Sequence, residues 1–181
     1  MFNLESSSEE VWPIIEIEML VRDGELGRSL LIDHVTIFEN VKNFDNLRLL
    51  YSKNNHYGSI RGMHFQLQEL NEWKLVTCLQ GTVFDVVIDV RPNSKNFGRY
   101  KFFTLSELSN KGIIIPPGFA HGYQSLSSNT ILGYLLTGSA SDKPVLTLDP
   151  LDLTIGIPWP DTQNLKLEKS ENYLTLRDIV A

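Results

Sequence analysis

The chain has 181 residues, 42% of them hydrophobic, which predicts a single compact domain over residues 1–181 with a substantial core. The formal net charge of −6 argues against a nucleic-acid surface, because binding to a phosphate backbone needs clustered Lys and Arg. The N-terminus lacks the pattern of a signal peptide, and no apolar run reaches membrane-spanning length, so we expect a cytoplasmic protein that binds a small molecule or another chain.

The central part of the chain alternates apolar segments with short turns. Before it, residues 34–46 place Val35, Phe38 and Val41 at helical spacing, which predicts a short amphipathic helix among the N-terminal strands. The turns that follow are too closely spaced for crossover helices, and the pattern predicts an all-β antiparallel sandwich or barrel. The predicted strands cover residues 74–79, 82–90, 99–104, 112–115, 121–126, 130–136 and 145–148.

Cys78 is the one cysteine of the chain and lies within the apolar strand predicted over residues 74–79. It has no partner for an intrachain disulfide, which suits a reducing compartment. We therefore expect a buried, neutral thiol.

The segment Gly58–Gln66 combines an arginine, a glycine and a histidine on a probable strand. Histidine can act as a base near neutral pH, and the fork of Arg61 suits a diphosphate. A structural histidine and a solvated arginine are the alternatives. On a regular strand Arg61 and His64 point to opposite faces, whereas Gly62 between them permits a bulge or a close ligand approach.

Three further polar residues are candidates for the same site. Lys74 is either an ordinary residue at a strand entry or a cation that stabilises an oxyanion. His121 follows a Pro-x-Gly-x-x-His turn, and Asp85 lies on an apolar strand, where a buried carboxylate needs a partner. We predict that Asp85 pairs with His121, either as a core pair or as part of a catalytic site.

A metal site is not expected from the histidine spacing. Small β-barrels often bind a metal with a His-x-His pair, but Gln66 stands where the second histidine would follow His64. His121 is the only plausible later imidazole, which leaves the ligand set incomplete.

Together these residues resemble the dTDP-4-dehydrorhamnose 3,5-epimerase family, cupin-type enzymes that epimerise nucleotide sugars without a metal. The likeness spans residues 58–178. It includes Arg61-Gly-Met-His-Phe-Gln66, Lys74-Leu-Val, Ile115-Pro-Pro-Gly-Phe-Ala-His-Gly122 and Leu174-Thr-Leu-Arg-Asp178. It implies a cupin-type β-barrel or jelly roll with a few short helices and no cofactor. It also implies a homodimer whose N-terminal strands complete the partner's site, and a C-terminal tail that closes the site.

The resemblance also implies roles for individual residues. His64 would remove the proton next to the C4 ketone of the sugar, Asp178 would orient the imidazole, and Lys74 would hold the enolate oxygen. The residues expected to bind substrate are Arg61, Gln66, His121 and Arg28, with Asp85 in support of His121.

The chain departs from the family pattern at two places. The acid tyrosine is expected six residues beyond the position of Tyr134, where this chain has Ala140. Tyr134 itself or water would then return the proton, or one of the two inversions, or all epimerisation, has been lost. Two N-terminal segments that hold the nucleotide in the family are also replaced, and Arg28 would substitute in part. Thymidine, cytidine and guanosine diphosphate sugars therefore all remain open.

We expect a metal-independent epimerase that acts on a nucleotide-linked 4-keto-6-deoxy sugar at C3, at C5 or at both, in deoxysugar or surface-polysaccharide biosynthesis. Two alternatives stay open. One is a cupin that binds a sugar nucleotide without catalysis, and the other is a ketoisomerase that uses a similar enolate but moves the carbonyl.

Overall fold

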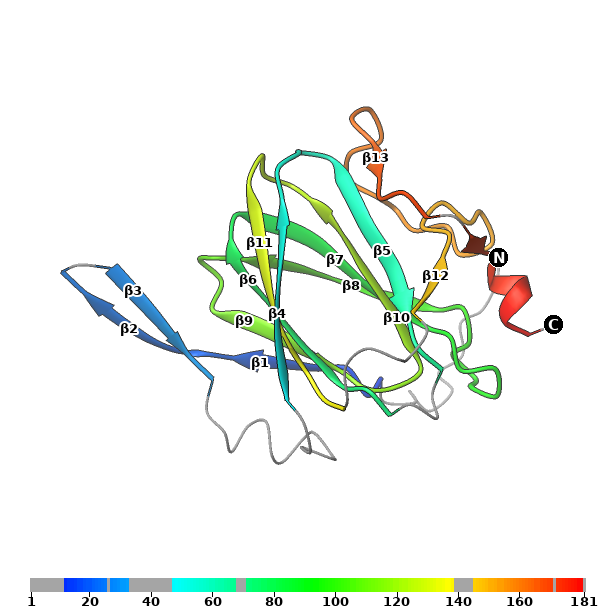
Figure 1. Cartoon of the computed structure of the whole chain (residues 1–181), viewed down its shortest axis with the longest axis horizontal. Helices are drawn as coiled ribbons and strands as arrows, with labels where there is room; N and C mark the ends of the chain where they lie inside the picture. Colours follow the sequence, from blue (N-terminus) through cyan, green and yellow to red (C-terminus); the bar gives the residue numbers. More distant parts are fainter. Residues whose placement is uncertain are drawn as a thin grey trace, which may run out of the picture.

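A computed structural model describes residues 12–25, 27–32, 47–67, 71–138, 145–170 and 172–180. Strands dominate these residues (Figure 1). The elements are β1 (Ile15–Glu18), β2 (Leu20–Gly24), β3 (Gly27–Leu31), β4 (Arg48–Asn54), β5 (Ser59–Phe65), β6 (Lys74–Gln80), β7 (Thr82–Asp89), β8 (Tyr100–Ser106), β9 (Lys111–Ile115), β10 (Phe119–Ser125), β11 (Thr130–Leu136), β12 (Leu146–Leu148), β13 (Lys166–Leu167), β14 (Tyr173–Leu174) and the 3₁₀ helix η2 (Leu176–Ile179).

Two sheets form the barrel. One has five strands in the order β1-β9-β6-β11-β4, and the other runs β14-β12-β5-β10-β7-β8, with β13 added beside β5. Most pairs are antiparallel, whereas β12 pairs with β14 and β13 with β5 in parallel. The hairpin of β2 and β3 is a separate sheet that projects from one end of the barrel (Figure 1). This architecture is the predicted all-β barrel of cupin type.

The main core lies between the two sheets because the strands alternate apolar side chains toward the interior. The five-stranded sheet contributes Val76, Ile113 and Leu132, and the facing sheet contributes Val83 and Val87. All five side chains are fully buried, so this core fixes the separation of the sheets and the width of the space between them.

A second core covers the outer face of the larger sheet. There Ile60, Val86 and Ile88 pack with Trp159 and with Leu174 from the C-terminal segment. Strand β7 is consequently buried on both faces, which explains why its sequence is apolar almost throughout rather than alternating. The C-terminal segment is therefore an integral layer of the fold.

The predicted strands agree with the observed ones to within two residues at each end. The helix predicted over residues 34–46 lies outside the described residues. Cys78 is fully buried, as predicted, and burial raises the pKa of its thiol to about 11. Within the described ranges, no helix is long and apolar enough to cross a membrane.

Candidate active site

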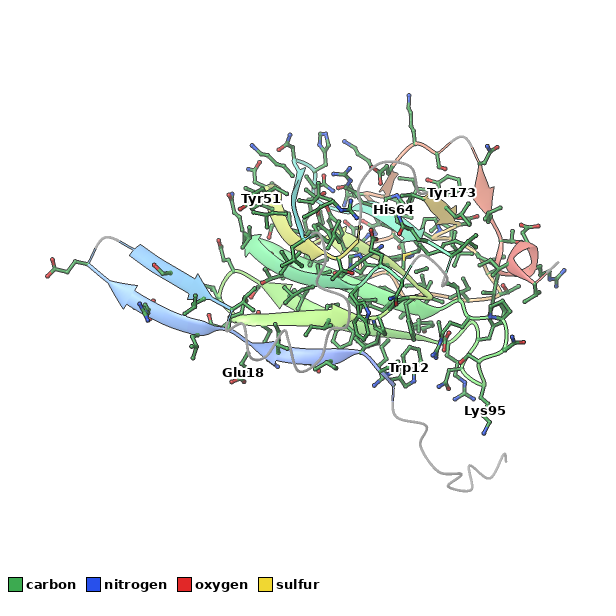
Figure 2. All side chains as sticks on the ribbon, turned by 60° about the horizontal axis from the view of Figure 1, so that its bottom comes forward. Trp12, Glu18, Tyr51, His64, Lys95 and Tyr173 are labelled. Atoms are coloured by element: carbon green, nitrogen blue, oxygen red, sulfur yellow. The ribbon has the colours of Figure 1, made fainter. Side chains whose placement is uncertain are left out.

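A cavity of about 290 Å³ opens between the two sheets. Strands β4, β6 and β11 form one wall, and β5 and β10 form the other. Its lining residues are Arg48, Leu50, Ser52, Arg61, His64, Gln66, Glu72, Lys74, His121, Tyr123, Tyr134, Leu136 and Val145. Figure 2 shows His64 on the side of the barrel that also carries Tyr173, away from Trp12 and Lys95.

Arg61 and His64 both line this cavity, although a regular strand would separate them. The register of β5 against β10 shifts between His121 and Tyr123, and Gly62 has a φ of +113°. A Cβ at Gly62 would lie 2.6 Å from Cα of Gly122, so the two strands approach more closely than any side chain at position 62 would allow. The bulge permitted by Gly62 therefore places both side chains on one face.

Glu168 joins Arg61 and His64 at the mouth of the cavity. Arg61 donates from Nη2 and Nε to Oε1 of Glu168 at 2.7 and 3.2 Å. Nε2 of His64 lies 3.4 Å from Oε2 of the same carboxylate. Strand β13 runs beside β5 and ends immediately before Glu168, which explains how a residue 107 positions after Arg61 reaches it.

The prediction that Asp178 orients His64 is wrong for this structure. Asp178 lies in η2, where its carboxylate accepts hydrogen bonds from the backbone and hydroxyl of Thr175, both at 2.7 Å, and caps the helix. Asp178 is exposed, and these bonds hold its pKa below the ordinary value. The carboxylate that faces His64 is Glu168.

His64 is poised to act as a base. Burial lowers the pKa of its imidazole, with a smaller opposing effect from Glu168 and a further lowering from the nearby Lys74. The imidazole is therefore neutral at neutral pH and can accept a proton.

Lys74 lies at the start of β6 beside a second buried carboxylate. Its Nζ is 3.7 Å from Oε1 of Glu72, and Arg48 donates from Nη2 to Oε2 of Glu72 at 2.6 Å. Burial lowers the pKa of Lys74, Glu72 opposes this, and Arg48 adds to the lowering. An ammonium in this position can stabilise negative charge that develops in the cavity.

Two phenols reach the cavity from different strands. Tyr134 of β11 is buried, with its ring 5.9 Å from that of His121 in an edge-on contact, and burial raises its pKa well above the ordinary value. Tyr123 of β10 pairs with Ser52 at 3.1 Å, and Ser52 accepts a hydrogen bond from Arg61 at 2.7 Å. Tyr134 is thus protonated and can donate a proton or a hydrogen bond.

The predicted partner of Asp85 is confirmed as His121. Nε2 of His121 lies 2.8 Å from Oδ2 of Asp85, which is fully buried. Burial raises the pKa of Asp85, and His121 opposes this rise. The pair fixes the orientation of an imidazole that forms part of the cavity wall.

The other predicted site residues have different positions. Gln66 lines the cavity, and its buried Oε1 has no hydrogen-bond partner among the described residues. Arg28 lies in β3, within the hairpin that projects from the barrel. Ala140 is outside the described residues. Among the residues that are described, no group of three His, Cys, Asp or Glu side chains is placed to hold a metal ion.

The cavity therefore combines a neutral base on one sheet with an ammonium and a protonated phenol on the other. Such a set can remove a proton next to a carbonyl, hold the resulting enolate oxygen and return a proton from another direction. The cations Arg61 and Arg48 at the same cavity can attract an anionic substrate, because guanidinium groups bind phosphates in a forked geometry.

Sequence reasoning missed Glu72, Glu168 and Arg48. A signal existed for Glu72, because it stands two residues before Lys74, where an extended chain directs both side chains to one face. Glu168 and Arg48 depend on long-range strand pairing, for which the sequence holds no local signal.

A sequence profile of the dTDP-4-dehydrorhamnose 3,5-epimerase family matches residues 36–178. The chain is 37% identical to the dTDP-4-dehydrorhamnose 3,5-epimerase of Escherichia coli K12 over 176 residues, which cover 94% of each protein. It is 36% identical to the Sinorhizobium fredii protein of the same name over 115 residues, which span 64% of this chain and 59% of that relative.

Solved structures agree with these matches. The epimerase RmlC from Legionella pneumophila, in complex with dTDP-4-keto-L-rhamnose, has a TM-score of 0.78 and 28% identity over 88% of this chain and 85% of that one. ChmJ, a 3'-monoepimerase from Streptomyces bikiniensis in complex with dTDP-quinovose, has a TM-score of 0.80 and 25% identity over 93% and 86%. The profile match and the full-length relative lead to one conclusion: the chain belongs to the dTDP-4-dehydrorhamnose 3,5-epimerase family.

Proposed function

We propose that this protein epimerises a nucleotide-linked 4-keto-6-deoxy sugar at C3, at C5 or at both, through an enolate. The observation that carries the proposal is the placement of His64 on one sheet and of Lys74 and Tyr134 on the facing sheet, around one cavity. Inversion of a carbon needs a proton to leave on one face and to return on the other. Groups that come from two facing sheets satisfy this requirement.

His64 takes the proton next to the ketone. Its Nε2 faces Glu168, which leaves Nδ1 for the substrate and provides a counter-charge for the imidazolium that forms. Glu168 thereby fills the role that the sequence suggested for Asp178. Because Arg61 binds the other oxygen of Glu168, the carboxylate is held in place from two sides.

Lys74 holds the enolate oxygen, and Tyr134 returns a proton to the opposite face of the carbon. In a double mutant of ChmJ, 25% identical to this chain, the replaced histidine and tyrosine are 70 positions apart. His64 and Tyr134 have the same separation. This match supports Tyr134, rather than position 140, as the acid. The tyrosinate then regains its proton through solvent as His64 releases the one it took.

The proposed substrate is a dTDP-linked sugar, because the relatives of known name act on dTDP sugars. The exposed cation at the cavity mouth, Arg61, is suited to its diphosphate. We place the reaction in the cytoplasm, since the single, reduced cysteine suits that compartment.

Proton NMR in deuterated water, with dTDP-4-keto-6-deoxyglucose and its CDP and GDP counterparts, tests the function directly. We expect the signals of C3–H, C5–H or both to disappear with the dTDP sugar as deuterium enters, and an epimeric product to form. Formation of a 3-keto product would instead identify a ketoisomerase. Stabilisation by the ligand without any exchange would identify a binding protein.

We further propose a homodimer in which the β2–β3 hairpin of one copy completes the site of the other and brings Arg28 to it. The outer face of β4 supports this, because Leu49 and Tyr51 are 64% and 60% exposed and the strand has a partner on one edge only among the described residues. Sedimentation equilibrium should give twice the chain mass of 20.6 kDa at micromolar concentration. A monomer at every concentration would contradict the dimer.

A further inference from the structure

The carboxylate of Glu72 is an unusual feature of the cavity because it is almost completely buried between two cations. Its side chain is 7% exposed, and it binds Arg48 at 2.6 Å through one oxygen and approaches Lys74 to 3.7 Å with the other. Arg48 is itself fixed by a hydrogen bond of 3.1 Å from Nε to the carbonyl of Gly138, at the end of β11. Three charges thus share one wall of the cavity.

We propose that Glu72, anchored by Arg48, is a positioning residue that keeps the Lys74 ammonium charged and fixed at the place where the enolate oxygen forms. The proposal rests on the proposed function for the identity of that oxygen. Its physical basis does not, because it concerns the protein's own charges.

The charges decide the direction of the effect. Burial and Arg48 both favour the neutral amine of Lys74, and Glu72 alone favours the ammonium. Without Glu72, two cations would face each other in a buried site with no anion between them. Lys74 would then lose its proton more readily and would stabilise an oxyanion less well.

A merely structural ion pair between Glu72 and Arg48 would not require Lys74 to be close. The approach of Lys74 to the second oxygen of Glu72, on the side of the cavity, is what separates the two interpretations. The other ionisable groups that line the cavity or face it come from the remaining strands and the C-terminal segment. They are Arg61, His64, His121, Tyr123, Tyr134 and Glu168.

The test measures the charge of Lys74 without substrate. Acetic anhydride acetylates only neutral amines, so the rate of acetylation of Lys74 against pH, followed by mass spectrometry, reports its protonation. Lys95, exposed on the far side of the barrel (Figure 2), is the reference lysine in the same sample. We expect Glu72→Gln to raise the rate at Lys74 severalfold relative to Lys95 at a given pH and to move the profile to lower pH.

Two further variants make the test specific. Adding Arg48→Gln to Glu72→Gln removes the second cation and should return the Lys74 profile toward that of the wild type, whereas a structural role predicts no such return. Glu72→Asp keeps the charge and should leave the profile close to that of the wild type. The double variant also restores charge balance, so it provides an answer if Glu72→Gln alone does not fold.

Catalysis supplies the second measurement. At pH 8, Glu72→Gln should lower kcat/KM for proton exchange about tenfold, less than the roughly 10²–10³-fold loss that follows removal of a whole oxyanion donor. An unchanged acetylation profile in Glu72→Gln would overturn the proposal. If the profile moves but the wild type exchanges no proton in any substrate, the proposed function fails and the role of Glu72 toward Lys74 stands.

Discussion

Replacing His64 by glutamine should lower the rate of proton exchange in the substrate about 10³-fold, within the range that a general base contributes. Glutamine keeps a polar side chain next to Glu168 but cannot take a proton from carbon. The measurement is deuterium incorporation at C3 and C5 by NMR, with circular dichroism to show that the fold is intact. Exchange at the wild-type rate would remove His64 from the mechanism.

His56 offers a matched control, because it is an exposed histidine in the turn between β4 and β5, outside the cavity. His56→Gln should leave exchange unchanged. Glu168→Gln should give a smaller loss than His64→Gln, on the order of tenfold, since the base remains but its imidazolium loses the counter-charge.

The pH dependence of the same reaction follows from the causes of the pKa shift. Burial lowers the pKa of His64 below 6.5, so the neutral base is present at pH 7 and exchange falls as the pH drops through this lowered value. Glu168 opposes that lowering, so Glu168→Gln should move the acid limb to still lower pH. A shift to higher pH would contradict the assigned contact between Glu168 and His64.

Replacing Tyr134 by phenylalanine should separate exchange from inversion. Proton removal by His64 continues, so deuterium still enters the substrate, but inversion should slow about 10²-fold because the acid on the opposite face is absent. The measurement compares deuterium content with the amount of epimer in the same NMR sample. Equal losses of exchange and inversion would indicate that Tyr134 shapes the cavity without delivering the proton.

Tyr123 is the matched control for this experiment, since it is the other phenol in the cavity but binds Ser52. Tyr123→Phe should reduce inversion less than Tyr134→Phe. The opposite order would transfer the role of the acid to Tyr123.

The strands of the barrel were predictable because their alternation, apolar runs and turn residues are all local in sequence. The pair of Asp85 and His121 was also predictable, since a carboxylate on an apolar strand must find a partner and one imidazole followed a suitable turn. These inferences needed only the period of a strand and the cost of a buried charge.

The partner of His64 was not predictable in the same way. A closing motif suggested Asp178, but that residue caps η2, and Glu168 reaches the imidazole because β13 runs parallel to β5. Parallel pairing of two short segments far apart in the chain leaves no periodic trace in the sequence. The placement of Arg48 beside Glu72 depends on the same kind of long-range contact.

The position of Glu168 has a consequence for how the protein is made. The strands that carry His64, Lys74 and Tyr134 leave the ribosome well before Glu168, and the outer core of the larger sheet stays uncovered until the C-terminal segment docks. A nascent chain can therefore hold the barrel while its base still lacks a counter-charge. Assembly of the catalytic groups and burial of the last apolar surface become one event, late in folding.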